Sequence, residues 1–136
     1  MRILHIKNGT AVKVLSKNPE EKKDWIIKGS STLYRGPVLL ADIEKGQISG
    51  YATLQAVYEL DTVDFISNEK HHRVPIRSHN NRLPYDRTWA WVLVDANGFK
   101  DPIPYEPDNK CSIWGTLRED SLPIYYSNMF RALENA

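Results

Sequence analysis

The segment from Lys23 to Gly36 gathers more chemically capable side chains than any other stretch of the chain. It holds three cations, two aromatic rings, three hydroxyl groups and two glycines, namely Lys23, Trp25, Lys28, Gly29, Ser30, Ser31, Thr32, Tyr34, Arg35 and Gly36. Ammonium and guanidinium groups bind anions, aromatic faces stack on bases, and glycines let the backbone approach a ligand. The segment therefore predicts a pocket for a flat, hydrogen-bonding ligand, with or without a linked phosphate.

Each of these residues also has a purely structural interpretation. Lys23 could be a buried amine of lowered pKa that acts as a base or anion ligand, or a surface lysine in a charged run. Trp25 could stack on a base or pack in the core. Lys28 and Arg35 could clamp a phosphate, or be solvated charges. The hydroxyl-rich stretch between them could bind a ligand through its N–H groups, or be an ordinary turn.

A second basic segment runs from Lys70 to Arg87. It holds five basic residues against one acid, Asp86, and three of the four histidines of the chain. His72 and Arg73 belong to its run of four consecutive lysine, histidine and arginine residues, 70–73. Adjacent histidines without a third spaced ligand are weak evidence for a metal, so we expect no metal site. A basic loop that contacts phosphates fits better, and it predicts an affinity that falls with salt.

Bulk composition describes one globular domain. The chain has 136 residues, of which 41% are hydrophobic and 26% charged, and its formal net charge is +1. A single cysteine, Cys111, excludes an internal disulfide and a cysteine-based zinc cage. No apolar run has the length of a signal peptide or a membrane span. We therefore expect a cytoplasmic protein that needs no cofactor.

Hydrophobic periodicity predicts the elements that must position these side chains. Alternation of apolar and polar residues over Ile48–Leu60 indicates a long, half-buried strand, and Gly50 on its inward face indicates a close approach or a bend. The stretch 61–84 is expected to be a long functional loop. The other expected elements are strands at Arg2–Ile6, Trp25–Ile27, Pro37–Ala41, Thr88–Val94, Lys100–Tyr105 and Cys111–Leu117, helices at Thr10–Ser16 and Ser121–Leu133, and a turn at Asp95–Gly98.

These elements predict an α+β domain, a small and partly closed β-barrel with two or three short flanking helices. In order along the chain, four motifs resemble those of the ASCH domain, a branch of the PUA-like fold. The motifs are Lys23–Gly36 with the apolar strand Val38–Leu40, Gly50–Leu54, Trp89–Leu93, and Pro102–Tyr105 with Ile113–Leu117. The resemblance spans Met1 to Leu117, which leaves 118–136 as a C-terminal extension that is expected to be helical.

The resemblance implies nucleic-acid binding, with RNA or a modified base as ligand. The residues expected to form the basic and aromatic cleft are Lys23, Trp25, Lys28, Ser30, Ser31, Thr32, Tyr34, Arg35, His72 and Arg73. Two alternatives stay open: a nucleoside or RNA hydrolase (an amidohydrolase or ribonuclease) that uses Lys23, and a regulatory module that binds another protein.

The hydrolase alternative departs from the family pattern. Small amidohydrolases of this family use a lysine, a threonine three residues later and a distant glutamate. Lys23 matches the lysine, but Ile26 occupies the threonine position and carries no hydroxyl. No glutamate of the chain can be matched to the third residue from the sequence.

Overall fold

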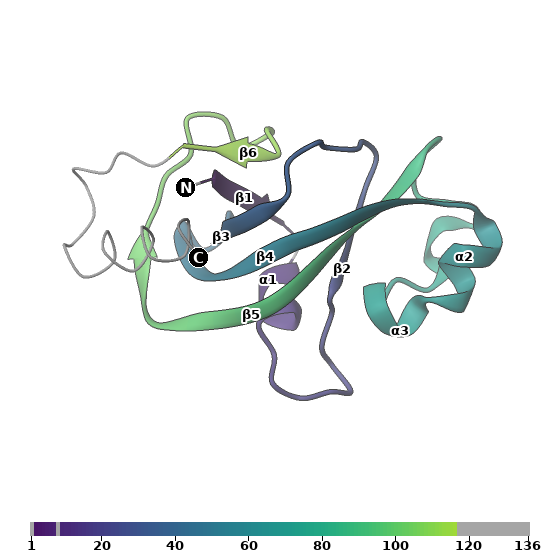
Figure 1. The fold of residues 1–136 in the computed structure, drawn as a ribbon, viewed down its shortest axis with the longest axis horizontal. Coiled ribbons are helices and arrows are strands. Elements are labelled where there is room, and N and C mark those ends of the chain that lie inside the picture. Colours follow the sequence, from purple (N-terminus) through teal and green to yellow (C-terminus); the bar gives the residue numbers. More distant parts are fainter. Residues whose placement is uncertain (1, 8, 117–136) are drawn as a thin grey trace.

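The computed structural model describes residues 2–7 and 9–116. These residues form a mixed sheet that curls into a partly closed barrel, with strand order β2-β5-β4-β3-β1-β6 (Figure 1). The strands are β1 (Arg2–Ile6), β2 (Trp25–Lys28), β3 (Gly36–Asp42), β4 (Gln47–Leu60), β5 (Thr88–Pro104) and β6 (Trp114–Gly115). The predicted α+β fold, a partly closed barrel with short flanking helices, is confirmed.

Strands β4 and β5 form one long antiparallel pair in the sheet, and other strands pair on either side of it. Strand β3 pairs with β4 on one side, and β2 pairs with β5 on the other, both antiparallel. Only the β1–β3 pair among the described strands is parallel. Because β5 lies between β4 and β2, it is a central strand there, as the apolar run Thr88–Val94 predicted.

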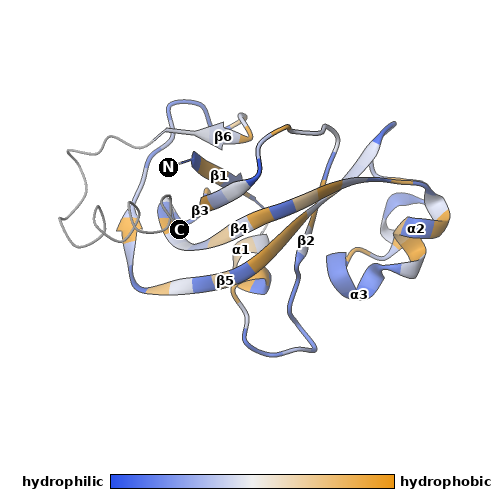
Figure 2. Cartoon of the chain, in the orientation of Figure 1, coloured by the Kyte–Doolittle hydropathy of each residue, from blue (hydrophilic) through white to orange (hydrophobic). Residues whose placement is uncertain are grey.

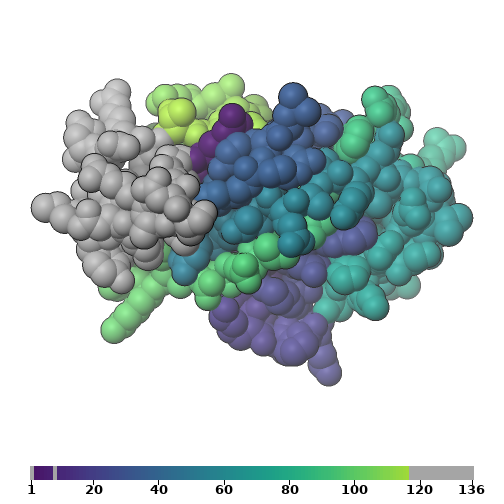
Figure 3. Space-filling view, viewed as in Figure 1, coloured from purple at the N-terminus to yellow at the C-terminus, as the bar shows by residue number. Residues whose placement is uncertain are grey.

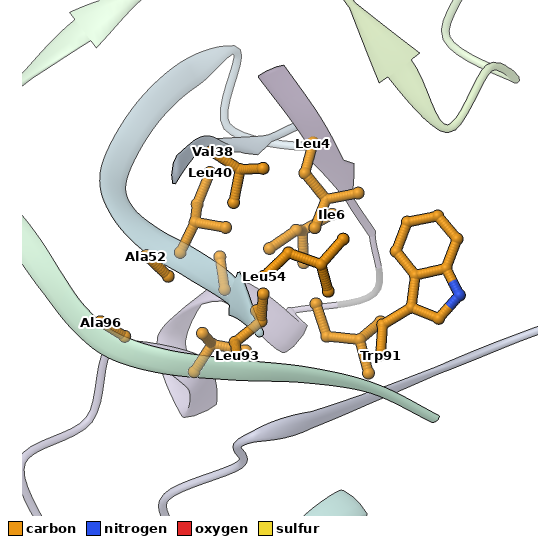
Figure 4. Close-up of a cluster of buried hydrophobic side chains, with 12 residues drawn as sticks. Leu4, Ile6, Val38, Leu40, Ala52, Leu54, Trp91, Leu93 and Ala96 are labelled. Atoms are coloured by element: carbon orange, nitrogen blue, oxygen red, sulfur yellow. The ribbon is translucent and has the colours of Figure 1, made fainter. Parts of the chain in front are cut away.

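The main core fills the inside of the curled sheet. Ile48, Gly50, Ala52 and Leu54 of β4 alternate with partly exposed neighbours, which confirms the predicted inward face over this part of the strand. Figure 4 shows residues of β1, β3, β4 and β5 converging in this core, with the Trp91 ring at its edge. Figure 2 shows hydrophobic residues along the middle of β4 and β5 and polar residues in the connecting loops.

Gly50 marks the close approach that its position predicted. A Cβ atom on Gly50 would collide with the carbonyl oxygen of Asn97 in β5 and would lie 2.9 Å from the Leu15 side chain. Leu15 ends helix α1 (Thr10–Val14), which confirms the predicted helix in this part of the chain. The absence of a side chain at Gly50 therefore lets the α1 region pack against the β4–β5 pair.

The predicted turn at Asp95–Gly98 is wrong. Strand β5 continues through these residues to Pro104, so the edge strand predicted at Lys100–Tyr105 is the last part of β5 and not a separate strand. Asp95 has a positive φ of 54°, and the β4–β5 register shifts between Tyr51 and Thr53, opposite this region. The turn-forming residues therefore make a bulge instead of a reversal, because β4 is long enough to pair with both halves of β5.

The predicted long loop 61–84 contains three short helical elements, namely α2 (Thr62–Ser67), α3 (Glu69–His72) and the 3₁₀ helix η1 (Ile76–His79). Helix α2 begins with a capping box in which Asp61 and Asp64 satisfy each other's backbone N–H groups. Phe65 anchors the segment in a satellite core with Leu60 and Ala90. The segment is partly helical instead of an irregular loop, because two buried side chains, Phe65 and His72, fix a stretch that is otherwise polar.

At the other end of the described chain, only Trp114–Gly115 of the predicted strand Cys111–Leu117 pairs in the sheet, next to β1. The predicted extension 118–136 and its helix at Ser121–Leu133 lie outside the described residues. No helix within the described residues is long and apolar enough to cross a membrane.

Candidate functional site

A cleft of about 720 Å³ opens between the end of β1, helix α1, strand β2 and the segment 73–85. Its lining is strongly basic, and no aspartate or glutamate is among the described residues that line it. The lysine, arginine and histidine residues in the lining are His5, Lys7, Lys13, Lys23, Lys28, Arg73 and His79. Five of the 18 lysine and arginine residues of the chain line one concave surface with no carboxylate among its described residues, so this cleft attracts anions.

Two segments far apart in the sequence meet beside this cleft. The backbone N–H of Asp24 donates to the His71 carbonyl at 3.1 Å, and the Asp24 carboxylate pairs with the His71 ring at 3.0 Å. In the space-filling view of Figure 3, the segment before β2 (purple) adjoins the helical segment after β4 (teal) at the lower right. The two basic regions of the sequence therefore face one another.

Lys23 is the most deeply buried cation in the lining. Its backbone N–H donates to the Lys13 carbonyl at 3.1 Å, which fixes its position, and its side chain is 8% exposed. No hydrogen bond or ion pair joins its ammonium to another described residue. Because no buried side-chain nitrogen among the described residues lacks a partner, the ammonium must reach solvent through the cleft. Burial first, then repulsion from Lys13 and Lys28, lowers the Lys23 pKa to about 8.

Lys28 projects into the cleft from the last residue of β2. Its Nζ atom lies 5.9 Å from the centre of the Trp91 ring, over the ring face. Burial first, then repulsion from Lys7, lowers the Lys28 pKa to about 8. The Trp91 indole N–H donates to the Ser30 carbonyl at 3.0 Å and holds the chain where it leaves β2. Lys23, Lys28 and Ser30 of the predicted site thus line the same cleft.

Arg73 also lines the cleft, but its guanidinium is already engaged. Nε donates to the Lys22 carbonyl at 3.0 Å and Nη2 donates to the Pro19 carbonyl at 2.8 Å. Arg73 is therefore a brace that holds the segment carrying Lys23, in addition to its charge at the cleft. The sequence suggested only a direct contact with phosphate.

Trp25 does not line the cleft. Strand alternation turns it to the face opposite Ile26 and Lys28, where it stacks on the His71 ring with centroids 4.9 Å apart. The Tyr58 ring lies on the same side, 6.5 Å from the Trp25 ring. The alternative that Trp25 packs structurally is the one that the geometry favours.

Tyr34 and Arg35 lie outside the cleft lining too. The Tyr34 hydroxyl donates to the Pro37 carbonyl at 2.6 Å, and the Arg2 guanidinium covers the Tyr34 ring at 4.4 Å. Arg35 is exposed and donates from one nitrogen to the carbonyls of Thr32 and Tyr34, each at 2.8 Å. Ser31 and Thr32 complete this separate turn. The expected shared hollow of Trp25, Tyr34 and Arg35 with Lys28 is therefore not formed.

His72 is a structural residue, which corrects its assignment to the ligand site. It is fully buried, stacks on Phe65 and donates from Nε2 to the Phe65 carbonyl at 2.6 Å. Its Nδ1 accepts from the Val74 N–H at 3.0 Å, so the ring is held neutral. Burial, the largest cause, lowers the His72 pKa. A histidine without exposed surface cannot contact a bound strand.

Sequence reasoning missed several residues of the cleft. Lys7, Thr10 and Lys13 come from the loop after β1 and the exposed face of α1, and no local motif marks them. Tyr85 is the aromatic residue of the lining and is 48% exposed. Its ring lies so close to Gly29 that a Cβ atom there would be 2.8 Å from Tyr85 Cδ1. Gly29 was therefore a signal in the sequence that another group approaches the backbone there. The sequence did not show that this group is Tyr85.

His5 forms part of the cleft wall in a fixed orientation. Its Nδ1 lies 3.0 Å from the Ser112 carbonyl and must donate to it, which leaves Nε2 to accept from the Tyr105 hydroxyl at 2.7 Å. Burial, the largest cause, lowers the His5 pKa. No group of three histidine, cysteine, aspartate or glutamate side chains within the described residues could hold a metal ion.

The structure is similar to that of ASCH from Zymomonas mobilis, with a TM-score of 0.68 and 12% sequence identity over 95% of this chain and 93% of that chain. Two mutants of that protein, one with serine changed to alanine and one with tyrosine changed to phenylalanine, match with the same TM-score and identity. They cover 96% and 97% of this chain, and 94% and 96% of their own. No protein-family model and no curated protein sequence matches the chain. The ASCH fold implied by the sequence motifs is thereby confirmed.

Proposed function

We propose that this ASCH-type module binds single-stranded nucleic acid, RNA or a strand with a modified base, in the basic cleft. The observation that carries the proposal is the pair of unneutralised ammonium groups on Lys23 and Lys28, in a cleft with no described carboxylate in its lining. Folding leaves two amines partly desolvated without a counter-charge, which costs stability. An anionic ligand would supply that counter-charge.

An aromatic ring in the same cleft favours a nucleotide over a bare anion. Tyr85 is half exposed and lies over the backbone at Gly29, next to Lys28. Single-stranded recognition combines a cationic groove for phosphates with aromatic faces for bases. In this proposal Tyr85 takes the stacking role that the sequence assigned to Trp25 and Tyr34, while Lys23 and Lys28 contact phosphate.

Fluorescence anisotropy with a labelled single-stranded RNA, titrated across salt concentrations, tests the proposal. We expect Lys23→Met and Lys28→Met each to weaken binding and to flatten the slope of log affinity against log salt by about 0.7 per lost phosphate contact. Lys45→Met is the matched control, because Lys45 is exposed in the turn between β3 and β4. Equal affinity of wild type and the Lys23/Lys28 double variant at low salt would refute the proposal.

The same titration addresses the kind of ligand. Matched RNA and DNA strands, and RNA strands with and without an acetylated cytidine, differ only in the sugar or in one base. A preference for one member of a pair identifies what the cleft reads, because the phosphate contacts are the same in both members. Affinity that is equal for every strand would leave phosphate binding supported and refute a modified-base reader.

Hydrolysis of a nucleoside or RNA is a second candidate, because one observation favours it. The Lys23 amine, with a pKa lowered to about 8, shares the cleft with the Thr10 hydroxyl, which could replace the hydroxyl that Ile26 lacks. Such an amine is neutral often enough near neutral pH to act as a general base. Purified protein should then turn over acylated nucleosides or RNA, and Lys23→Met should abolish the turnover. Absence of turnover on both substrate types would eliminate this candidate.

A further inference from the structure

Lys23 combines three properties that ordinary surface lysines do not share. It is buried in the wall of the cleft, no described residue pairs with its amine, and the amine still faces the space that a ligand would occupy. Its charged neighbours Lys13 and Lys28 repel a proton on it. A lysine that is desolvated and adjacent to other cations is activated as a nucleophile towards carbonyl groups.

Lys28 and Lys23 differ in a way that divides the roles between them. The pKa of each is lowered to about 8, so the difference is one of contacts: the Lys28 ammonium lies over the face of Trp91, 5.9 Å from the ring centre. Lys23 has no such contact and is flanked by two cations. Lys28 is therefore placed to hold an anion, while Lys23 is placed to offer a free electron pair.

The lining also favours one type of lysine chemistry over another. Hydrolysis needs a group that activates water and commonly a second one that protonates the leaving group. The described lining has no carboxylate for these tasks, and His5 is engaged by Ser112 and Tyr105, which leaves His79 and the amines. Condensation with an aldehyde needs a neutral amine and a nearby proton donor. The neighbouring ammonium groups of Lys13 and Lys28 can donate that proton.

We infer that Lys23 forms an imine with an aldehyde carried by a phosphate-bearing ligand, which Lys28 and its neighbours hold by the phosphate. The inference rests on the proposed binding of phosphate in this cleft. The neutral Nζ attacks the aldehyde carbon and a C–N bond forms. A proton passes from nitrogen to the former carbonyl oxygen, which gives a neutral carbinolamine. A second proton, from a neighbouring lysine ammonium, lets that oxygen leave as water, and a protonated imine remains. Ligands of this class include an open-chain sugar phosphate and the sugar of a base-free site in a nucleic-acid strand.

Pyridoxal 5′-phosphate is a suitable first probe, because it carries an aldehyde and a phosphate on one small ring. The 136-residue chain is incubated with it, borohydride then transfers hydride to the imine carbon, and the stable amine is located by peptide mass spectrometry. We expect one dominant adduct on Lys23. 5′-Deoxypyridoxal keeps the free aldehyde but lacks the phosphate, and it should give at least 10-fold less adduct at equal concentration, because the neighbouring cations no longer hold it.

Three variants make the assignment specific. Lys23→Arg keeps the positive charge but cannot form the imine, so we expect the dominant adduct to vanish. Lys45→Arg and Lys100→Arg are exposed controls outside the cleft that should change nothing. Adducts spread evenly over surface lysines of the wild type, or undiminished total adduct in Lys23→Arg, would overturn the inference. The wild-type peptide map decides this even if a variant fails to fold.

The pH dependence separates an activated lysine from one that is merely close to bound phosphate. At about pH 7.5, an amine with a pKa of about 8 has a neutral fraction roughly 200-fold larger than one at the usual 10.5. The initial labelling rate at Lys23 should therefore level off above about pH 8. A Lys23 rate that keeps rising to pH 10 would contradict the inference.

A second arm identifies the source of the aldehyde. A single-stranded oligonucleotide with one base-free site is trapped with borohydride beside an intact oligonucleotide and glyceraldehyde 3-phosphate. Trapping of the oligonucleotide alone indicates a strand ligand, and trapping of the sugar phosphate alone indicates a free metabolite. Trapping of neither refutes the inference. If Lys23→Arg still binds intact RNA as wild type does while wild type forms no imine, the proposed function stands and only this inference fails.

Discussion

Replacing Lys23 with methionine should stabilise the fold at neutral pH while it removes a cation of the cleft. Below pH 8 the lysine is charged in both the folded and the unfolded chain, so the folded state bears the cost of a buried charge. A pKa lowered from 10.5 to about 8, at 1.36 kcal/mol per pKa unit, sets an upper limit of about 3 kcal/mol on that cost. Since Lys23 is only 8% exposed, we expect about 1–3 kcal/mol to appear as added stability in Lys23→Met.

The sign of the pH dependence follows from the same pKa. Between pH 8 and 10.5 the unfolded chain binds more protons at this position than the folded chain, so wild-type stability rises with pH across that window. The advantage of Lys23→Met should therefore shrink, to below about 1 kcal/mol near pH 10. Other groups that titrate there, including tyrosines, are common to both proteins and cancel in the difference.

Urea denaturation followed by tryptophan fluorescence, from pH 6 to pH 10, measures this difference directly. Lys45→Met is the control, and its stability relative to wild type should not vary with pH in this way. The reasoning is refuted if Lys23→Met is less stable than wild type at pH 7, or if the difference stays constant up to pH 10. Either result would mean that Lys23 carries its charge in the folded state without penalty.

Three further outcomes are expected. Gly29→Ala should push the Tyr85 ring aside and weaken RNA binding several-fold in anisotropy, while thermal unfolding changes little if the exposed ring moves freely. Arg73→Ala should lower unfolding stability by about 1–2 kcal/mol, because two carbonyls lose their donor, and limited proteolysis should then cut the segment before Lys23 faster. Asp61→Ala should cost about 1 kcal/mol in urea denaturation through the lost helix cap and leave RNA affinity unchanged.

Local patterns predicted the scaffold well. Apolar residues alternate with polar ones in Ile48–Leu60 and form continuous runs in β3 and β5. These patterns predict which side chains are buried, and burial determines which face of each strand points into the core. The predictions failed at the turn in β5 and the loop after β4. There the outcome depends on pairing with a distant strand and on Phe65 reaching a satellite core, neither of which is visible within a local window.

The sequence by itself determined the kind of chemistry available, because the residue types are present whatever the fold: amines, guanidinium groups, aromatic rings and hydroxyl groups beside glycines. Only the tertiary structure decided which of them share a cleft. The two-residue period of β2 sends Lys28 inward and Trp25 outward, and the contact of two distant segments adds Lys13 and Tyr85. A shared site is a property of distances between residues remote in the chain, and those distances are set by packing.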